Sequence, residues 1–166
     1  MSAAATTVAI IGDTHLPRGS RRLPDECVRR IRAADLLVHV GDFSAVAAYE
    51  EIAAIGPRLV AVHGNVDDDE LTRRLPERNA IEIGGARLAV IHNAGPARGR
   101  MARMRKLFPD ADAVLFGHSH MPLHEREAGF QIFNPGSPTE RRRAPKHTMG
   151  VATIRNGRIR LRHVSL

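Results

Sequence analysis

The sequence predicts an α/β fold in which two β-sheets pack face to face and helices cover their outer surfaces. In the first half of the chain, short apolar runs alternate with helical patterns, as is typical of parallel strands joined by crossover helices. In the second half, apolar runs are separated by turn signals, which favours antiparallel hairpins. The 166 residues are enough for one domain with a single buried core, and no repeat or linker divides them. We therefore expect one domain over residues 1–166.

The first half contains three predicted strands and two predicted helices. The strands are apolar, partly β-branched runs that end near a glycine: Thr7–Ile11, Leu36–Val40 and Leu59–Val62. The first helical pattern covers Pro24–Arg32. The second helix is expected over Ala45–Ile55, with Ser44 as its N-cap.

The second half contains six predicted strands and one basic helix. Gly84-Gly85 joins the first two of these strands into a hairpin, and Asn156-Gly157 joins the last two. The strands are Ala80–Ile83, Arg87–Ile91, Ala113–Phe116, Phe130–Phe133, Val151–Ile154 and Ile159–His163. The helix is expected over residues 97–108. We expect mainly antiparallel pairing in this half.

The charge balance is basic, with 25 Lys and Arg residues against 18 Asp and Glu residues and a formal net charge of +7. Such a surface attracts phosphate-bearing molecules or nucleic acid, but it also fits a solvated, arginine-rich surface. The basic residues cluster at Arg21-Arg22, Arg98–Lys106 and Arg141–Arg143. With no Trp, one Tyr and five Phe, the chain has few aromatic residues for a stacking platform, so nucleic-acid binding is not the favoured interpretation.

Cysteine content and hydropathy indicate the expected compartment. Cys27 is the only cysteine, which excludes an internal disulfide, and we interpret it as a buried, inert thiol. No apolar run approaches the roughly 20 residues of a membrane span. The N-terminal residues show no secretory signal pattern. We expect a cytoplasmic protein without membrane contact.

Potential metal ligands follow five of the predicted strands, each directly after an apolar run. They are Asp13, His15, Asp42, Asn65, His92, His118 and His120. Ligands of open α/β sheets bind beyond the carboxyl ends of the strands, so these side chains are expected to meet. Seven donors exceed the needs of one tetrahedral ion but serve two ions that share a carboxylate. Oxygen and imidazole donors without thiolate suit Mn, Fe, Zn, Co or Ni.

The spacing of the ligands suggests how they converge. In an extended segment, residues i and i+2 point the same way, so Asp13 and His15 are expected to face one site. The same holds for His118 and His120. Glycines precede the ligands at positions 12, 41, 64 and 117, where the backbone must turn tightly and leave room for metal and substrate.

Six short motifs therefore stand in order along the chain: Gly12–His15, Gly41-Asp42, Gly64–Asp67, His92, Gly117–His120 and Asn134–Ser137. In this order they resemble the calcineurin-like metallophosphoesterases, and the short length is similar to the small YfcE-type branch. The resemblance spans roughly residues 7–155. It implies the metallo-dependent phosphatase fold, a four-layer α/β/β/α sandwich with two mixed β-sheets.

The resemblance also implies a role for each ligand. The ligands divide between two ions: Asp13, His15 and His120 for the first, Asn65, His92 and His118 for the second, with Asp42 as the bridge. We expect Asp42, His118 and His120 to take part in catalysis. Small relatives have His-Gly where this chain has His92-Asn93, and larger relatives have a proton-donating His where this chain has Val66. Valine cannot protonate a leaving group, which favours esters with good leaving groups.

These observations predict a hydrolase that cleaves a phosphodiester or a phosphomonoester by in-line attack of a hydroxide between two ions. Mn²⁺ is the expected ion, with Ni²⁺, Zn²⁺, Fe²⁺ and Co²⁺ as alternatives. The expected partner is a small phosphate-ester substrate. A homodimer that pairs through exposed edge strands is an alternative that the sequence does not require. Two other functions remain: an interaction scaffold similar to the retromer subunit of this fold, which the complete ligand set disfavours, and a nuclease.

The remaining polar residues near these motifs have simpler interpretations. His39 lies within a strand and is expected to be a hydrogen-bonded structural residue. Asp67 is expected to cap its loop or to orient a ligand. His63 can support the turn at Asn65. The other histidines are expected at the surface or in packing: His124, His147 and His163.

Overall fold

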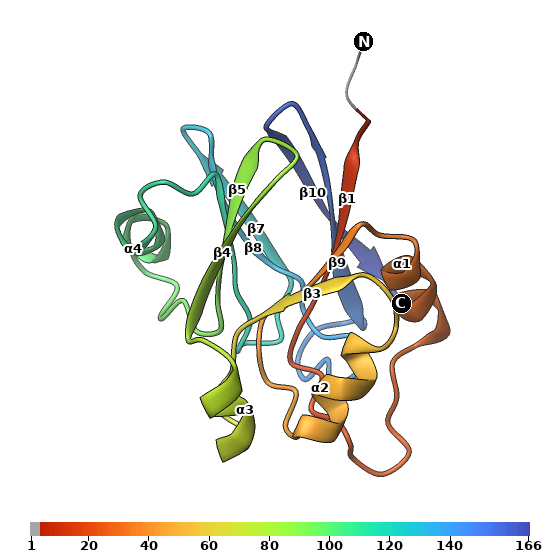
Figure 1. Ribbon diagram of the computed structural model, residues 1–166. Helices are drawn as coiled ribbons and strands as arrows, with labels where there is room; N and C mark the ends of the chain where they lie inside the picture. Colours follow the sequence, from red (N-terminus) through yellow and green to blue (C-terminus); the bar gives the residue numbers. More distant parts are fainter. Residues whose placement is uncertain (1–3) are drawn as a thin grey trace.

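The first of two five-stranded sheets contains the N-terminal and C-terminal strands in the computed structural model, which describes residues 4–166 (Figure 1). Its order is β10-β9-β1-β2-β3. The strands are β1 (Thr6–Ile11), β2 (Leu36–His39), β3 (Arg58–Ala61), β9 (Thr148–Arg155) and β10 (Arg158–Ser165). β1, β2 and β3 run parallel, whereas β9 is antiparallel to β1 and β10. The carboxyl ends of the three parallel strands therefore meet at one end of the sheet.

The second sheet has the order β4-β5-β6-β8-β7. Its strands are β4 (Arg78–Ile83), β5 (Ala86–Ile91), β6 (Ala113–Leu115), β7 (Leu123–Glu127) and β8 (Phe130–Asn134). β4–β5 and β7–β8 are antiparallel pairs, but β6 pairs in parallel with both β5 and β8. The expectation of mainly antiparallel pairing was therefore wrong at the centre of this sheet, because α4 and the connection that follows it carry the chain back to the end at which β5 began.

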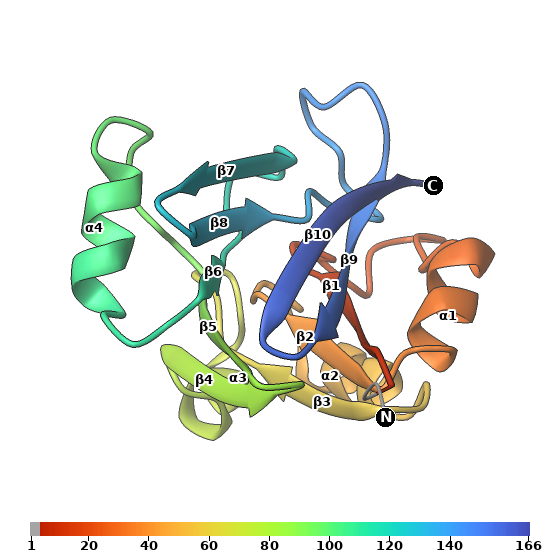
Figure 2. The ribbon, with the colours of Figure 1, turned by 90° about the horizontal axis from the view of Figure 1, so that it is seen from above.

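Helices cover the outer face of each sheet. They are α1 (Asp25–Arg32), α2 (Val46–Ala53), α3 (Asp69–Arg74) and α4 (Arg100–Leu107). Cys27 and Ile31 of α1, Ile52 of α2 and Leu71 of α3 are buried in one cluster with the first sheet. Met104 of α4 is buried against the second sheet. In the view from above, α4 and α1 lie at opposite sides of the molecule (Figure 2).

The central core lies between the two sheets. Val8, Ile10 and Val38 of the first sheet are buried together with Leu88 and Leu115 of the second. The inner and outer clusters together give four layers in the order α/β/β/α, with two mixed sheets, as predicted. Burial raises the pKa of the Cys27 thiol to about 12, which fits an inert packing residue. Within residues 4–166, no helix is long and apolar enough to cross a bilayer.

The local errors of the sequence-based assignment lie near loops. The short helix α3 and the edge strand β7 were not predicted, because their polar sequences carry little hydrophobic periodicity. Ser44 does not cap α2: its φ is 93°, and its amide donates to Asp67. The carboxylate of Asp68 instead accepts a hydrogen bond from the amide of Val46 at 3.1 Å, at the start of α2.

Candidate metal centre

The first of two side-chain clusters joins the ends of β1 and β6. Asp13 and His15 follow β1, and His120 follows β6; one donor atom from each lies within 4.8 Å of the others. The Nε2 atoms of His15 and His120 are 3.2 Å apart, and Asp13 Oδ1 is 3.7 Å from His120 Nε2. All three residues are buried. This is the set that was predicted for the first ion.

The second cluster gathers Asp42, His92 and His118, whose donor atoms also lie within 4.8 Å of one another. Asn65 joins them, because its Oδ1 lies 3.0 Å from His92 Nε2 and 2.9 Å from His118 Nδ1. His92 thus occupies the predicted place despite the following Asn93, whose side chain accepts the amide of Gly95 in a local turn. All seven predicted residues meet at one end of the two sheets.

Asp42 lies between the clusters. Its Oδ2 is 3.6 Å from His15 Nε2 in the first cluster and 3.2 Å from His92 Nε2 in the second. Its other oxygen accepts a hydrogen bond from the amide of Val66 at 2.9 Å. One carboxylate oxygen therefore faces both clusters while the other is fixed to the backbone, which is the geometry that a bridging ligand requires.

The chemistry of the clusters fits bound cations. Asp13 Oδ2 is buried and has no hydrogen-bond partner within the described residues, and burial raises the pKa of this carboxyl to about 7. A buried, unpaired carboxylate is costly unless a positive charge compensates it. At Asp42, burial acts to raise the pKa, but the contacts with His92, the amide of Val66 and His15 together hold the pKa below its usual value.

The histidines present lone pairs to the clusters. Burial lowers the pKa of His120 to about 4 and also lowers the pKa of His15 and His118, so these rings are neutral at pH 7. His92 Nδ1 donates to the carbonyl of Val40 at 2.8 Å, and His120 Nδ1 donates to the carbonyl of Glu140. In both rings Nε2 is therefore the nitrogen that faces the cluster, as is usual for metal-binding histidines. At His92, burial acts to lower the pKa, but the neighbouring carboxylates of Asp42 and Asp13 together raise it above its usual value.

The backbone at the ligands is not extended, in contrast to the reasoning from i and i+2. Asp13, His15 and Asp42 have φ values of 51°, 46° and 64°, and His118 and His120 have 74° and 61°. Five of the seven ligands thus adopt the left-handed conformation, which is unfavourable for residues with a Cβ. The side chains converge because each loop reverses sharply after its strand.

The preceding glycines serve two purposes. Gly41 has a φ of 98° and meets the expectation of a tight turn. Gly64 provides space instead, because a Cβ there would lie 2.0 Å from Asp42 Oδ1. Gly12 does the same for the core, since its Cβ would lie 2.1 Å from Val40 Cγ2.

Two polar anchors hold the ligand loops. Asp67 accepts hydrogen bonds from the amides of Asp42 at 3.1 Å, Ser44 at 2.8 Å and Gly64 at 2.6 Å, so it caps the loops after β2 and β3 as expected. In the Asn134–Ser137 turn, Asn134 Nδ2 donates to the carbonyl of Gly117 at 3.1 Å, and Ser137 Oγ donates to the carbonyl of Asp13 at 2.8 Å. This turn therefore connects the loops after β1 and β6.

The other histidines have structural contacts. His39 is fully buried, accepts the amide of Gly41 at 3.1 Å and contacts Thr14 Oγ1 at 3.0 Å, as its prediction stated. His63 lines a small pocket of about 170 Å³ behind Asn65 and His92. The remaining contacts of this kind are His124 with Gln131 and His163 with the carbonyl of Asn134.

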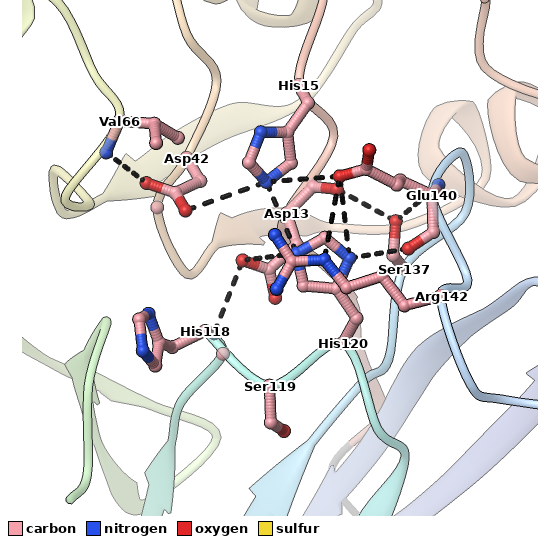
Figure 3. A network of polar contacts seen from close by, with 12 residues as sticks. Asp13, His15, Asp42, Val66, His118, Ser119, His120, Ser137, Glu140 and Arg142 are labelled. Atoms are coloured by element: carbon pink, nitrogen blue, oxygen red, sulfur yellow. Dashed lines mark hydrogen bonds and ion pairs between the residues drawn. The ribbon is translucent and has the colours of Figure 1, made fainter.

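Sequence reasoning missed Glu140 and Arg142, which border the first cluster (Figure 3). Glu140 Oε2 is 3.6 Å from His15 Nε2, and Arg142 Nε is 3.9 Å from the same Glu140 oxygen. The run Arg141–Arg143 had been noted only as a basic cluster. Glu140 carried no signal, because its contact with His15 joins residues 125 positions apart in an irregular loop.

Comparison with known proteins agrees with this geometry. The sequence pattern of the calcineurin-like phosphoesterase superfamily domain matches residues 7–157. A probable metallophosphoesterase of Methanothermobacter thermautotrophicus is 29% identical over 134 residues, which cover 80% of this chain and 77% of the relative. A phosphodiesterase of Methanocaldococcus jannaschii is 25% identical over 145 residues, covering 78% and 82% of the two chains. Among solved structures, Zn²⁺-bound Vps29 of Entamoeba histolytica has a TM-score of 0.72 at 21% identity, over 96% of this chain and 99% of the other, which is a likeness of fold.

Proposed function

This chain belongs to the calcineurin-like phosphoesterase superfamily, and on this premise we propose that it uses two divalent cations to hydrolyse a phosphodiester or a phosphomonoester. The observation that carries the proposal is the position of Asp42, whose Oδ2 faces His15 at 3.6 Å and His92 at 3.2 Å. A carboxylate oxygen that is shared by two ions holds them close together, and two neighbouring ions can act on one phosphoryl group.

We assign the residues to two cation sites from their positions. Asp13, His15 and His120 would hold one cation, and Asn65, His92 and His118 the other, with Asp42 shared. Bound there, the cations would supply a water of lowered pKa and would compensate charge on the phosphoryl oxygens. His118 is partly exposed, whereas His120 is fully buried, so of these two rings His118 lies nearer to an entering ester.

We propose Mn²⁺ as the working ion. The donors are carboxylate, amide and imidazole groups, which suit Mn²⁺ as well as its neighbours in the first transition row. The only thiol, that of Cys27, is buried between α1 and the first sheet and offers no soft ligand to the site. The unpaired oxygen of Asp13 supports a cation that accepts hard oxygen ligands.

The leaving group is the substrate feature that Val66 restricts. Its amide is tied to Asp42, and its side chain is 45% exposed beside the site. Valine cannot protonate the departing oxygen, so we propose esters whose alcohol leaves without protonation, such as aryl esters. Met121 is a second exposed apolar residue: its side chain is 39% exposed, and it directly follows His120.

Hydrolysis by metal-reconstituted protein tests the proposal. Protein stripped with a chelator is assayed with an aryl phosphodiester and an aryl phosphomonoester, before and after addition of Mn²⁺. We expect turnover only with metal, and a loss of at least about 100-fold in Asp42→Asn, because the shared ligand loses its charge. Asp110→Asn, which removes an exposed carboxylate in the turn between α4 and β6, is the matched control and should retain full activity. Near-normal turnover by Asp42→Asn would contradict the proposal, and metal binding without turnover of any ester would favour the scaffold function.

A further inference from the structure

One arginine of the loop between β8 and β9 carries free hydrogen-bond donors beside the metal centre. Arg141 donates to the carbonyl of Ala144 at 2.9 Å, so its guanidinium is engaged in the loop itself. Arg142 makes no hydrogen bond within residues 4–166; its nearest ionic partner is Glu140 Oε2, 3.9 Å from its Nε. Its φ of 48° is left-handed, and the backbone turns here between Arg141 and Arg143.

Glu140 connects Arg142 to the first cluster. Glu140 Oε1 accepts hydrogen bonds from Arg18 at 3.2 Å and Arg21 at 3.4 Å. Its Oε2 lies 3.6 Å from His15 Nε2 and is also the oxygen next to Arg142. The carboxylate is thus held on one side by two arginines while its other oxygen faces the ligands. Arg142 lies on this second side, as Figure 3 shows.

Arg142 differs from its neighbours in what its guanidinium contacts. Arg141 is held by the carbonyl of Ala144, whereas Arg142 pairs with the Glu140 oxygen that also lies 3.6 Å from His15 Nε2. Of the three consecutive arginines, Arg142 is therefore the one that pairs with Glu140 within residues 4–166 and places its charge beside the first cluster.

A purely structural ion pair explains Arg142 poorly. Glu140 already has two closer arginine partners, and a third guanidinium at 3.9 Å adds little to them. The side chain of Arg142 is 51% exposed, and ion pairs between exposed side chains contribute little to stability. A guanidinium with free N–H groups can bind two phosphoryl oxygens at once. The Glu140 carboxylate, 3.9 Å from Arg142 Nε, does not occupy these N–H groups.

We propose that Arg142 forms an anion subsite that binds two non-bridging oxygens of the phosphoryl group at the metal centre, and that Glu140 positions its guanidinium. The ligand class is a phosphate ester or free phosphate. The inference deepens the proposed function and rests on it for the identity of the substrate. Arg142 contacts the substrate, whereas Glu140 acts through Arg142.

Binding of inorganic phosphate to the Mn²⁺-loaded protein tests the subsite without requiring turnover. Titration calorimetry compares wild type with Arg142→Ala and with Arg143→Ala, which removes the same charge one residue away. We expect phosphate affinity to fall at least about ten-fold in Arg142→Ala and to stay within about two-fold in Arg143→Ala, since a charged bidentate contact is worth more than one decade. Mn²⁺ affinity should be unchanged in both variants, which shows that the centre is intact.

Two further measurements separate binding from positioning. Arg142→Lys should recover part of the phosphate affinity, because it restores the charge without the fork. Glu140→Gln should weaken phosphate binding less than Arg142→Ala, and combining the two should add little to the effect of Arg142→Ala. Additive losses in the double variant would contradict the positioning role.

The outcomes distinguish this inference from the proposed function. Equal phosphate affinity in wild type and Arg142→Ala would overturn the subsite even if esters are hydrolysed. Absence of phosphate binding by the Mn²⁺-loaded wild type would overturn it as well. Phosphate binding that depends on Arg142, in a protein that hydrolyses no ester, would support the subsite and refute the enzymatic proposal.

Discussion

Asp13 is the residue at which function and stability conflict most clearly. Its Oδ2 has no partner within the described residues, and burial raises its pKa to about 7 from an ordinary value of 3.8. The folded, metal-free protein therefore binds a proton at Asp13 more tightly than the unfolded chain does. This contribution to stability is complete below pH 3.8 and is lost as the pH rises through about 7.

Asp13→Asn should consequently stabilise the metal-free protein at alkaline pH. An amide keeps the oxygen that accepts the amide of His118 at 3.2 Å but removes the buried charge. We expect no difference in the free energy of unfolding near pH 4 and a gain of roughly 2–4 kcal/mol for the variant at pH 8. Urea denaturation in the presence of a chelator measures this difference across the pH range. A variant that is less stable than wild type at pH 8 would show that the buried charge of Asp13 does not destabilise the metal-free protein.

The convergence of the candidate ligands was predictable from their residue types and their order along the chain. Seven Asp, Asn and His residues follow strands, and all seven meet at one site. The reason given for their convergence was wrong, since the backbone at Asp13 and His118 is left-handed rather than extended. Glu140 and Arg142 were not found, because an irregular loop has no periodicity that fixes which of its side chains turns inward.

At the scale of the elements, the loops that follow the strands determine the geometry of the site more than the helices do. Asp67 alone accepts three backbone amides from two loops, so the loop after β3 fixes the loop after β2. The strands were predicted from apolar runs because burial on both faces leaves a continuous pattern. Helix α3 and strand β7 escaped prediction because their stability depends on packing and pairing with distant segments.

Gly64→Ala tests the packing of these loops. The added Cβ would meet Asp42 Oδ1 at 2.0 Å, so the shared carboxylate must move away from both clusters. We expect a fall of at least about ten-fold in the affinity for the second Mn²⁺ ion, because the bridging geometry is lost. Titration calorimetry with Mn²⁺ measures it. Gly56→Ala is the matched control, since its Cβ would find no atom closer than 3.8 Å and Mn²⁺ binding should not change. Unchanged binding in Gly64→Ala would mean that Asp42 is not shared.

At the scale of the whole molecule, each cluster draws ligands from both sheets. Asp13 and His15 follow β1 while His120 follows β6, and Asp42 follows β2 while His92 follows β5. The apolar layer between the sheets was predictable from the pattern of the strands. The mixed order of the second sheet was not, because pairing of β6 with both β5 and β8 is a long-range choice.

Metal should therefore stabilise the whole fold and not only the loops. Each ion that binds only the folded state adds about 2.7 kcal/mol at a concentration of 100 times its Kd. For a chain of this length, one ion should raise Tm by roughly 5–10 °C. Thermal denaturation at increasing Mn²⁺ concentrations checks this, with Asp42→Asn as the variant that should lose most of the shift. A Tm that is independent of Mn²⁺ would contradict metal binding at both clusters.

The left-handed backbone at five ligands has a consequence for how such a chain can evolve. These conformations favour glycine, and to a lesser degree asparagine, over the histidines and aspartates that occupy them. Selection for the proposed catalysis would therefore act continuously against the local preference of the backbone. In a lineage released from that selection, replacement of His15 or His118 by glycine would relax the loop. Loss of the ligands would then be favoured by the fold itself, and the same scaffold would become more durable as it became inactive.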